Sequence, residues 1–322
     1  NDPSSILSPV LEHDQTVVQS FCDLCLSVPT AYGLAKDVDG GRPHTRIGVL
    51  GGGQLGRMMA EAAHRLGLQL VALDPKGDTS PTGQVTKCLA GSFQDEAKIR
   101  ELAVVTDVLT VEIEHVNAGI LTTMASEGVV IHPTGKTIHM IQDKFRQKEF
   151  LRSLGIAIGE YCVVATVTDA ESAGDSFGYP YMLKSRLLAY DGKGNAVVQS
   201  RNDLPNALKQ LRPTYAKDTT DLMLYAEKWV PFTKELAIMV VRGSENVDAY
   251  PVVETRQLNS VCDTVVAPAQ IPARVAADVR ALALETVKHL DGRGIYGIEF
   301  FVTSDNRVLL NEIAPRPHNS GL

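Results

Sequence analysis

The sequence has few cysteines, no long apolar run and no cluster of basic residues. Five cysteines in 322 residues are an odd number and too few for a disulfide framework, which indicates a reducing compartment. No run approaches the roughly 18 apolar residues of a membrane-spanning helix, and the first residues lack the pattern of a secretory signal. A net charge of −7 without a basic stretch gives no electrostatic footprint for nucleic acid or a membrane surface. We therefore expect a cytoplasmic protein that acts on small molecules.

What the chain does contain is the composition of an ordinary globular protein, with 44% hydrophobic and 21% charged residues. Its length predicts two domains, or one domain with an appendage. Residues 1–45 form an N-terminal extension in which prolines recur and no helical or alternating pattern is sustained, so no fold is predicted for it. Cys22 and Cys25 make a CxxC pair there, without a second pair or a nearby histidine. A loosely packed extension is favoured over a zinc or redox site.

Residues 46–135 show the alternation of strand and helix that opens a doubly wound parallel sheet. The predicted elements are strands at Ile47–Leu50, Leu68–Leu73 and Val108–Val111 and a helix at Leu55–Leu66. Gly67 stands where the C-cap of that helix is expected. The pattern predicts a Rossmann-like N-terminal domain.

A glycine motif lies between the first strand and the helix. Gly51, Gly53 and Gly56 match GxGxxG, and Asp74 ends the next strand. This spacing is the dinucleotide fingerprint, in which the glycines admit the pyrophosphate and the acid accepts from the ribose. By itself the motif suggests an NAD-dependent dehydrogenase. The alternative is a Rossmann-like half-domain whose glycine loop binds another anionic ligand, and the rest of the chain favours this alternative.

Residues 136–322 are predicted to form an α+β domain with mainly antiparallel strands. Its predicted helices are Thr137–Leu154 and Ala276–Leu290, and its predicted strands are Tyr181–Lys184, Ala196–Val198, Met223–Val230, Leu236–Val241, Gly297–Thr303 and Arg307–Ile313. Residues 174–178 fit GxSxG, the nucleophile elbow. The elbow needs a strand before the serine and a helix after it, and here the order is reversed, so this motif is rejected.

The last predicted hairpin places two carboxylates face to face. With a two-residue turn at Asp305 and Asn306, Glu299 lies directly across from Glu312. Like charges about 5 Å apart are unfavourable in a sheet, so an apolar hairpin with this pair is expected to hold a cation. Asn311 adds an oxygen ligand, and an oxygen-only set suits Mg²⁺ that carries substrate phosphates. The alternative is an acidic pair that faces solvent.

Two further segments suggest a nucleotide site. The loop Lys184–Asn195 is rich in glycine and can lay backbone N–H groups over phosphates, with Lys184 and Lys193 supplying positive charge. A flexible surface loop is an equal alternative. Glu227–Val230 ends a strand that can pair with an adenine edge, and Glu235 opens the next strand, where a carboxylate can accept from ribose hydroxyls. By itself Glu235 is more often an exposed glutamate.

A phosphate loop, a lysine on the adjacent strand, an adenine-edge strand and a carboxylate hairpin together match the ATP-grasp arrangement. From about Arg46 to Leu322 the sequence resembles the N5-carboxyaminoimidazole ribonucleotide synthetases of purine synthesis, in the version that forms the N-terminal half of fungal phosphoribosylaminoimidazole carboxylase. The segments that carry the resemblance are IGVLGGGQLGRMM, DVLTVEIEHVN, QDKFRQKEFL, LKSRLLAYDGKGN, YAEKWVPFTKELAIMVVR and GIEFFVTSDNRVLLNEIAPRPHNSG.

The resemblance implies the fold and the chemistry. The fold is α/β, with a Rossmann-like, substrate-binding pre-ATP-grasp domain at 46–135 and an α+β ATP-grasp domain at 136–322. The family continues into a small C-terminal domain, so the ATP-grasp fold is expected to be truncated at its C-terminus here. ATP would phosphorylate bicarbonate to carboxyphosphate, and the exocyclic amine of 5-aminoimidazole ribonucleotide would capture the carboxyl group. The implied cofactor is Mg²⁺, with Mn²⁺ as an alternative.

The resemblance also implies site residues. Those expected to contact the aminoimidazole nucleotide are Gln54, Leu55, Glu112, His318, Asn319 and Ser320. Those expected to hold ATP are Lys144, Lys184, Ala189, Tyr190, Asp191, Gly192, Lys193, Gly194, Asn195, Glu227, Lys228, Trp229, Val230, Glu235, Asn311 and Glu312. Glu299 and Glu312 would ligate the metal, and the expected catalytic residues are Tyr190, Asp191, Lys193 and Arg316. A fused or separate carboxylase half and a homo-oligomer are expected as partners. The alternative is an inactive nucleotide-binding fragment of the same enzyme.

Overall fold

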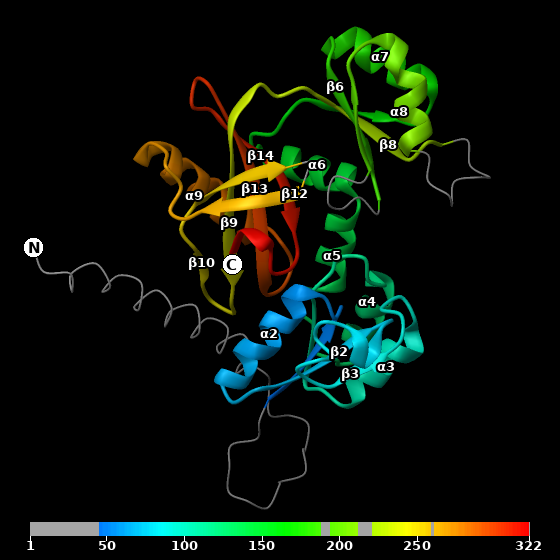
Figure 1. Ribbon diagram of the computed structural model, residues 1–322, viewed down its shortest axis with the longest axis vertical. Helices are drawn as coiled ribbons and strands as arrows, with labels where there is room; N and C mark the ends of the chain where they lie inside the picture. The colour runs from blue at the N-terminus through cyan, green and yellow to red at the C-terminus, as the bar shows by residue number, and fades with distance from the viewer. Residues whose placement is uncertain (1–44, 188–193, 212–220, 259–260, 322) are drawn as a thin grey trace, which may run out of the picture.

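The computed structural model describes residues 45–187, 194–211, 221–258 and 261–321 of the chain. Within these ranges the chain forms a parallel sheet of four strands, a small antiparallel sheet of four strands and a large antiparallel sheet of six strands. Figure 1 shows the parallel sheet and its helices (blue and cyan) below the two antiparallel sheets. As predicted, the first half is a parallel α/β domain and the second half is mainly antiparallel.

The parallel sheet has the strand order β3-β2-β1-β4. Its strands are β1 (Arg46–Leu50), β2 (Gln69–Asp74), β3 (Cys88–Ala90) and β4 (Val108–Val111), and its helices are α2 (Gln54–Arg65), η2 (Gly77–Thr79), α3 (Glu96–Val104) and α4 (Ala118–Ser126). Helices cover the sheet, so β1 is buried and its side chains form a nearly continuous apolar run. Because β1 and β4 are parallel neighbours, the glycine loop after β1 and Glu112 after β4 lie at the same edge of the sheet.

The helical connection to the second half differs from the prediction. A single helix is predicted over Thr137–Leu154, but the structure has two, α5 (Gly135–Gln142) and α6 (Lys144–Ser153). Asp143 separates them with an extended backbone, φ −91° and ψ 103°, and its carboxylate accepts from the first N–H groups of α6. An aspartate cap competes with helical hydrogen bonding, and apolar periodicity does not reveal it. The single-helix prediction is therefore wrong.

The small sheet has the order β5-β8-β6-β7 with all neighbours antiparallel. Its elements are β5 (Tyr161–Val164), α7 (Val167–Phe177), β6 (Tyr181–Ser185), β7 (Asn195–Val198), η3 (Arg201–Asp203), α8 (Leu204–Leu211) and β8 (Leu224–Lys228). The side chain of Thr166 and that of Asp169 form a reciprocal capping box at the start of α7. Ser176 lies inside α7 and before β6, so the rejection of a nucleophile elbow is confirmed.

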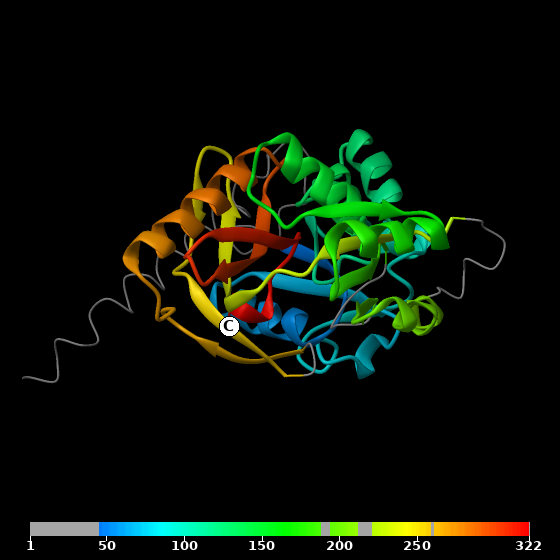
Figure 2. The same ribbon diagram turned by 90° about the horizontal axis from the view of Figure 1, so that it is seen from above.

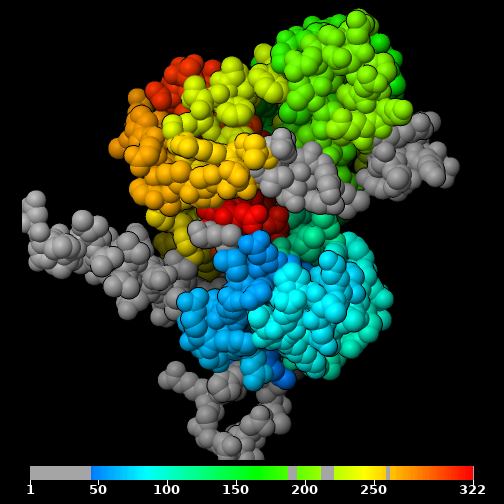
Figure 3. Space-filling view, in the orientation of Figure 1, coloured from blue at the N-terminus to red at the C-terminus, as the bar shows by residue number. Residues whose placement is uncertain are grey.

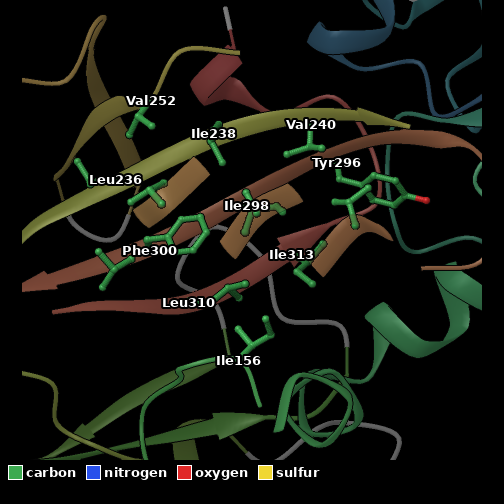
Figure 4. Close-up of a cluster of buried hydrophobic side chains, with 14 of the residues drawn as sticks. Ile156, Leu236, Ile238, Val240, Val252, Tyr296, Ile298, Phe300, Leu310 and Ile313 are labelled. Carbon is green, nitrogen blue, oxygen red and sulfur yellow. The ribbon is translucent and has the colours of Figure 1, made fainter. Parts of the chain in front are cut away.

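The large sheet has the order β12-β11-β9-β13-β14, and β10 pairs with β9. Its elements are β9 (Phe232–Arg242), β10 (Val247–Ala249), β11 (Val253–Leu258), β12 (Val261–Val266), α9 (Ala273–Lys288), β13 (Gly294–Thr303), β14 (Val308–Ala314) and η4 (Asn319–Gly321). Apolar side chains on one face of β9, β13 and β14 converge on a core (Figure 4), and α9 contributes Val275, Val279 and Val287 to it. Figure 2 shows α9 (orange) beside the large sheet, on the side away from the small sheet (green). The opposite face carries the polar residues of the candidate site.

The β13–β14 hairpin has the predicted pairing of Glu299 with Glu312, but for a different reason. The turn has three residues, 304–306: the Thr303 N–H donates to the Arg307 carbonyl at 3.0 Å, and Asn306 adopts φ +62°. This shifts the register by one residue, and a bulge at Asn311 shifts it back. The predicted two-residue turn is wrong, and the two differences cancel at the carboxylate pair.

The remaining predicted elements agree in type with the structure, and most of them differ at one or both ends, whereas the predicted strand Val108–Val111 matches β4 at both ends. The predicted strand at 236–241, for example, is the centre of β9, which spans Phe232–Arg242. Gly67 and Gly155 follow their helices at φ +71° and +70°, as helix C-termini require. In the part of the chain that the structure describes, no helix is both long and apolar enough to cross a membrane.

A half-buried histidine, His132, at the end of the parallel domain makes stability depend on pH. Burial, with Arg293 nearby, lowers the pKa of His132 to about 4. The unfolded chain therefore binds this proton between pH 6.5 and 4 while the folded chain does not, so stability is fully present above about pH 6.5 and falls as the pH is lowered. We expect His132→Gln to remove up to about 3 kcal/mol of this dependence.

The measurement is urea unfolding of both proteins at pH 7.5 and pH 5. The wild type should lose more free energy of unfolding than the variant over this interval. Equal losses would show that His132 takes up its proton as readily in the folded chain as in the unfolded chain.

Candidate active site

The site lies where the end of the chain meets the parallel domain and the two antiparallel sheets. Figure 3 shows the last described residues (red) between the parallel domain (blue and cyan) and the large sheet (yellow and orange). Charged side chains from α6, β6, β8, β14 and the segment after β14 form ion pairs there, and Glu299 of β13 lies beside His318.

The opposed carboxylates form one wall of the site. Burial, followed by the charges of Glu312 and Glu235, raises the pKa of Glu299 to about 7. His318 Nε2 lies 3.4 Å from a Glu299 oxygen, and the amide of Asn311 donates to the other oxygen at 3.4 Å. Burial also opposes ionisation of Glu312, but the adjacent ammonium of Lys144 outweighs it and lowers the pKa of Glu312.

This wall has the donor set of a hard divalent cation but does not form a complete metal site. Glu299 and Glu312 offer carboxylate oxygens, and Glu235 contributes negative charge nearby. Among the described residues, no group of three or more His, Cys, Asp or Glu side chains converges to hold a metal. Two carboxylates suit an ion such as Mg²⁺ that takes its other ligands from water and substrate phosphates.

A buried network of lysines and glutamate lies beside the carboxylates. Glu227 on β8 receives Lys184 from β6 at 2.5 Å and Lys148 from α6 at 2.7 Å. Burial opposes ionisation of Glu227, but the two ammonium groups outweigh it and lower its pKa to about 2. Glu227 therefore stays ionised and holds the phosphate-binding candidate Lys184 in place. Lys148 is missing from the predicted site because its spacing in α6 resembles that of any amphipathic helix.

Lys144 begins α6 and is almost fully buried, with its ammonium paired to Glu312. Asp143, directly before it, receives the Arg186 guanidinium at 2.6 and 3.2 Å, and the Lys144 N–H donates to the Arg186 carbonyl at 2.8 Å. These contacts fix the base of the loop that follows β6 against the start of α6. Asp143 and Arg186 are further site residues that sequence reasoning missed, because the pair joins positions 43 residues apart.

The strand end Glu227–Val230 lies at the junction of the two antiparallel sheets, directly before β9. Trp229 is exposed, and Lys228 pairs with Glu160 at 2.5 Å. Phe232 stacks on Phe301 with ring centroids 4.6 Å apart.

Glu235 lies on β9 beside the carboxylate wall. It pairs in register with Phe301 of β13, two residues beyond Glu299, so all three side chains emerge on the same face of the sheet. Burial raises the pKa of Glu235. Glu235 is half-buried, which favours a carboxylate that faces a ligand over the alternative of an exposed glutamate.

The glycine loop of the parallel domain is occupied by the chain's own carboxylate. Glu112 accepts from the Gly53 N–H at 3.3 Å, and a Cβ built on Gly53 would lie 2.6 Å from a Glu112 oxygen. Burial raises the pKa of Glu112, while loop N–H groups oppose that shift. Asp74 accepts from the Gly52 N–H at 3.0 Å, so its carboxylate stabilises the glycine loop.

A pyrophosphate would have to displace Glu112, so the dinucleotide interpretation of the motif is not supported by the geometry. Gln54, exposed at the first position of α2, and Leu55, buried behind it, lie beside the carboxylate of Glu112.

The segment after β14 connects this domain to the carboxylates. Arg316 forms a buried ion pair with Glu114, whose pKa falls to about 2: burial opposes ionisation, and the Arg316 charge outweighs it. Burial, followed by the charge of Arg316, lowers the pKa of His318 to about 4, and Ser320 Oγ lies 2.8 Å from His318 Nδ1. Asn319 is exposed. Glu114 was not singled out from sequence because its role depends on an arginine 202 residues away.

Part of the predicted phosphate loop lies outside the described residues, namely Ala189, Tyr190, Asp191, Gly192 and Lys193. The loop connects β6 to β7, and the structure describes its two ends. The Ser185 N–H donates to the Gly194 carbonyl at 2.7 Å, and Gly194 has φ +90°. Asn195 begins β7 and pairs with Lys184.

The fold and the site together define an ATP-grasp protein with a preceding parallel domain. A family model described as the ATP-grasp domain matches residues 149–322, and one described as the ribonucleotide synthetase preATP-grasp domain matches residues 44–142. The predicted fold class is thereby confirmed.

Curated relatives and solved structures show which ATP-grasp proteins this chain is similar to. Phosphoribosylaminoimidazole carboxylase of Ogataea methanolica is 48% identical over 85% of this chain and 50% of its own length. N5-carboxyaminoimidazole ribonucleotide synthase of Synechococcus elongatus is 38% identical over 87% of this chain and 69% of its own. The crystal structure of N5-carboxyaminoimidazole synthase from Aspergillus clavatus with ADP and 5-aminoimidazole ribonucleotide has a TM-score of 0.78 and 42% identity, covering 86% of this chain and 71% of that one.

The chain belongs to the N5-carboxyaminoimidazole ribonucleotide synthase family of ATP-grasp proteins. It spans about half the length of the fungal carboxylases it matches.

Arg316 is expected to stabilise the fold through Glu114 as well as to face the site. Arg316→Met leaves a buried carboxylate unpaired, which costs about 3–5 kcal/mol. The double variant with Glu114→Gln removes the unpaired charge and should regain most of that loss. Urea unfolding of both variants measures this, and a double variant as unstable as the single one would contradict the buried ion pair.

The occupied glycine loop predicts that NADH does not bind. Titration of the protein into NADH, followed by NADH fluorescence, should give no change beyond dilution. Saturable quenching that Gly53→Ala abolishes would instead revive the dehydrogenase interpretation, because that variant closes the loop without changing its charge.

Proposed function

We propose that this chain carries out the ATP- and bicarbonate-dependent carboxylation of 5-aminoimidazole ribonucleotide to its N5-carboxy derivative, in de novo purine (IMP) synthesis. The observation that carries the proposal is the position of two lysines, Lys144 paired with Glu312 and Lys184 paired with Glu227, beside the opposed carboxylates of Glu299 and Glu312. Cations for phosphates thus lie next to oxygen donors for a divalent ion. The names of the relatives, and the ADP and 5-aminoimidazole ribonucleotide bound to the Aspergillus clavatus synthase, support the same substrates.

In this proposal ATP lies between the two antiparallel sheets. Lys144 and Lys184 contact its phosphates, together with Gly194, Asn195 and the rest of the phosphate loop. The backbone of Glu227–Val230 pairs with the adenine edge, and Glu235 accepts from the ribose hydroxyls. Phosphoryl transfer needs little covalent participation by the protein, so positioning and charge neutralisation supply most of the catalysis.

Glu299 and Glu312 would hold Mg²⁺, or Mn²⁺ in its place, with Asn311 adding an oxygen ligand. The fit is supported by the oxygen-only donors, and by burial together with the charges of Glu312 and Glu235, which raise the pKa of Glu299. When bound, such an ion would neutralise charge on the ATP phosphates. Lys144, now paired with Glu312, would then be freed to contact phosphate.

The carboxylation proceeds in two balanced steps. A bicarbonate oxygen attacks the γ-phosphorus and ADP leaves, which gives carboxyphosphate. The exocyclic amine then attacks the carboxyl carbon, inorganic phosphate leaves, and the amine loses a proton. In this proposal Arg316 and His318 hold the anionic carboxyl group, with Asn319 and Ser320 beside them. Tyr190, Asp191 and Lys193 remain proposed catalytic residues on the strength of the family resemblance.

The aminoimidazole nucleotide is proposed to lie over the glycine loop, between residues 46–135 and the ATP-grasp residues 136–322. Gln54 and Leu55 would flank it, and the Glu112 carboxylate would accept from an N–H of the ribonucleotide. The aligned part of this chain covers only about half of the matched fungal relatives, so we also propose that a carboxylase half, fused or separate, uses the product. A homo-oligomer stays a prediction.

The proposal is tested by ADP release with Mg²⁺-ATP and bicarbonate, with and without 5-aminoimidazole ribonucleotide. We expect strong stimulation by the ribonucleotide, because carboxyphosphate is consumed only when the amine is present. ATP binding without stimulated hydrolysis would instead favour the inactive nucleotide-binding fragment.

Glu299→Gln should abolish this turnover, because a neutral amide replaces one of the two carboxylates expected to hold Mg²⁺. We expect a loss of at least 100-fold in kcat, on the order of 3 kcal/mol in the barrier. The exposed Glu101→Gln serves as control and should retain the rate. Full activity of Glu299→Gln would refute the assignment of the metal to this hairpin.

A further inference from the structure

Lys148 is a buried lysine with no assigned role in the site. Its side chain is 4% exposed, and it lies one helical turn after Lys144 in α6. A buried ammonium costs several kcal/mol unless it is both paired and hydrogen-bonded. Its two partners belong to different sheets: a Glu227 oxygen on β8 at 2.7 Å, and the Asn311 carbonyl oxygen on β14 at 2.8 Å. Lys148 therefore spans the junction across which ATP is proposed to bind.

The contact with Glu227 acts on the phosphate side of the site. The other oxygen of that carboxylate receives Lys184 at 2.5 Å, so one carboxylate lies between two ammonium groups. Lys184 has no other ion pair among the described residues. The position of its ammonium consequently depends on Glu227, and the orientation of Glu227 depends on Lys148.

The contact with Asn311 acts on the carboxylate hairpin. Asn311 is the extra residue of the bulge that returns Glu299 and Glu312 to direct opposition. A bulged residue loses its regular ladder partner, so its carbonyl needs a donor from elsewhere. Lys148 supplies that donor. The same ammonium thus supports the register of the metal-binding pair and the orientation of the phosphate-binding lysine.

We propose that Lys148 is a positioning residue that fixes Lys184 and the Glu299–Glu312 pair relative to one another, through Glu227 and the Asn311 carbonyl. It contacts neither nucleotide nor metal itself. The inference rests on the proposed ATP site and adds a residue that sets its geometry. Removing the Lys148 ammonium should weaken nucleotide binding and also the additional affinity that Mg²⁺ confers.

The single tryptophan of the chain gives a readout that does not require turnover. Trp229 lies at the proposed adenine strand, so its fluorescence should report ATP binding. ATP is titrated into the wild type and Lys148→Met, first with EDTA and then with Mg²⁺. We expect the variant to bind ATP at least tenfold more weakly without metal and to gain less affinity from Mg²⁺. A wild type that binds no ATP contradicts the proposed function, whereas a variant that matches a binding wild type overturns only the positioning role.

A double variant separates positioning from charge and from stability. Lys148→Met with Glu227→Gln removes one charge of each sign, so the net charge around Lys184 equals that of the wild type. This variant should regain the stability that the unpaired Glu227 carboxylate costs in Lys148→Met, although Lys184 loses its ion pair, while ATP affinity stays weak. If the double variant bound ATP with wild-type affinity, the role of Lys148 would be only to neutralise the charge of Glu227, and the proposal would be overturned. Val279→Ala is the control for destabilisation. It leaves a cavity in the core between α9 and the large sheet, and it should bind ATP with wild-type affinity.

Discussion

Compensation of buried charge is the constraint on which this site depends. The buried carboxylates of Glu114 and Glu227 and the buried ammonium of Lys144 each pair with an opposite charge from another part of the chain. An unpaired charge in such surroundings costs several kcal/mol, so each element that carries one partner must dock where the other is. The ion pairs therefore determine how the parallel domain, the two antiparallel sheets and the last segment meet.

Helix α6 is central to this arrangement. Its first residue reaches the carboxylate hairpin through Lys144, and its second turn reaches the small sheet through Lys148. Asp143, which caps the helix, also anchors the base of the phosphate loop through Arg186. One short helix thus places three groups around the proposed ATP phosphates. This explains why the chain breaks the helix at Asp143, where apolar spacing alone favours continuation.

Sequence patterns predicted those parts of the fold that depend on local periodicity. The parallel strands and the antiparallel second half follow from apolar spacing. The pairing of Glu299 with Glu312 was predicted from a turn that is one residue too short, and it holds because the bulge at Asn311 offsets the longer turn. The glycine motif is a case in which a local pattern suggests the wrong ligand. Its spacing fits a dinucleotide, yet Glu112, 59 residues away, occupies the loop.

The sequence by itself determined the family and the fold class, because these are carried by local motifs and by periodicity. Only the tertiary structure decided which charges pair. Lys148, Arg186 and Glu114 are ordinary polar residues in their own segments, and their roles arise from partners that are distant in sequence. The energy of a buried ion pair depends on distance and desolvation in space, and neither quantity is encoded in the spacing of residues along the chain.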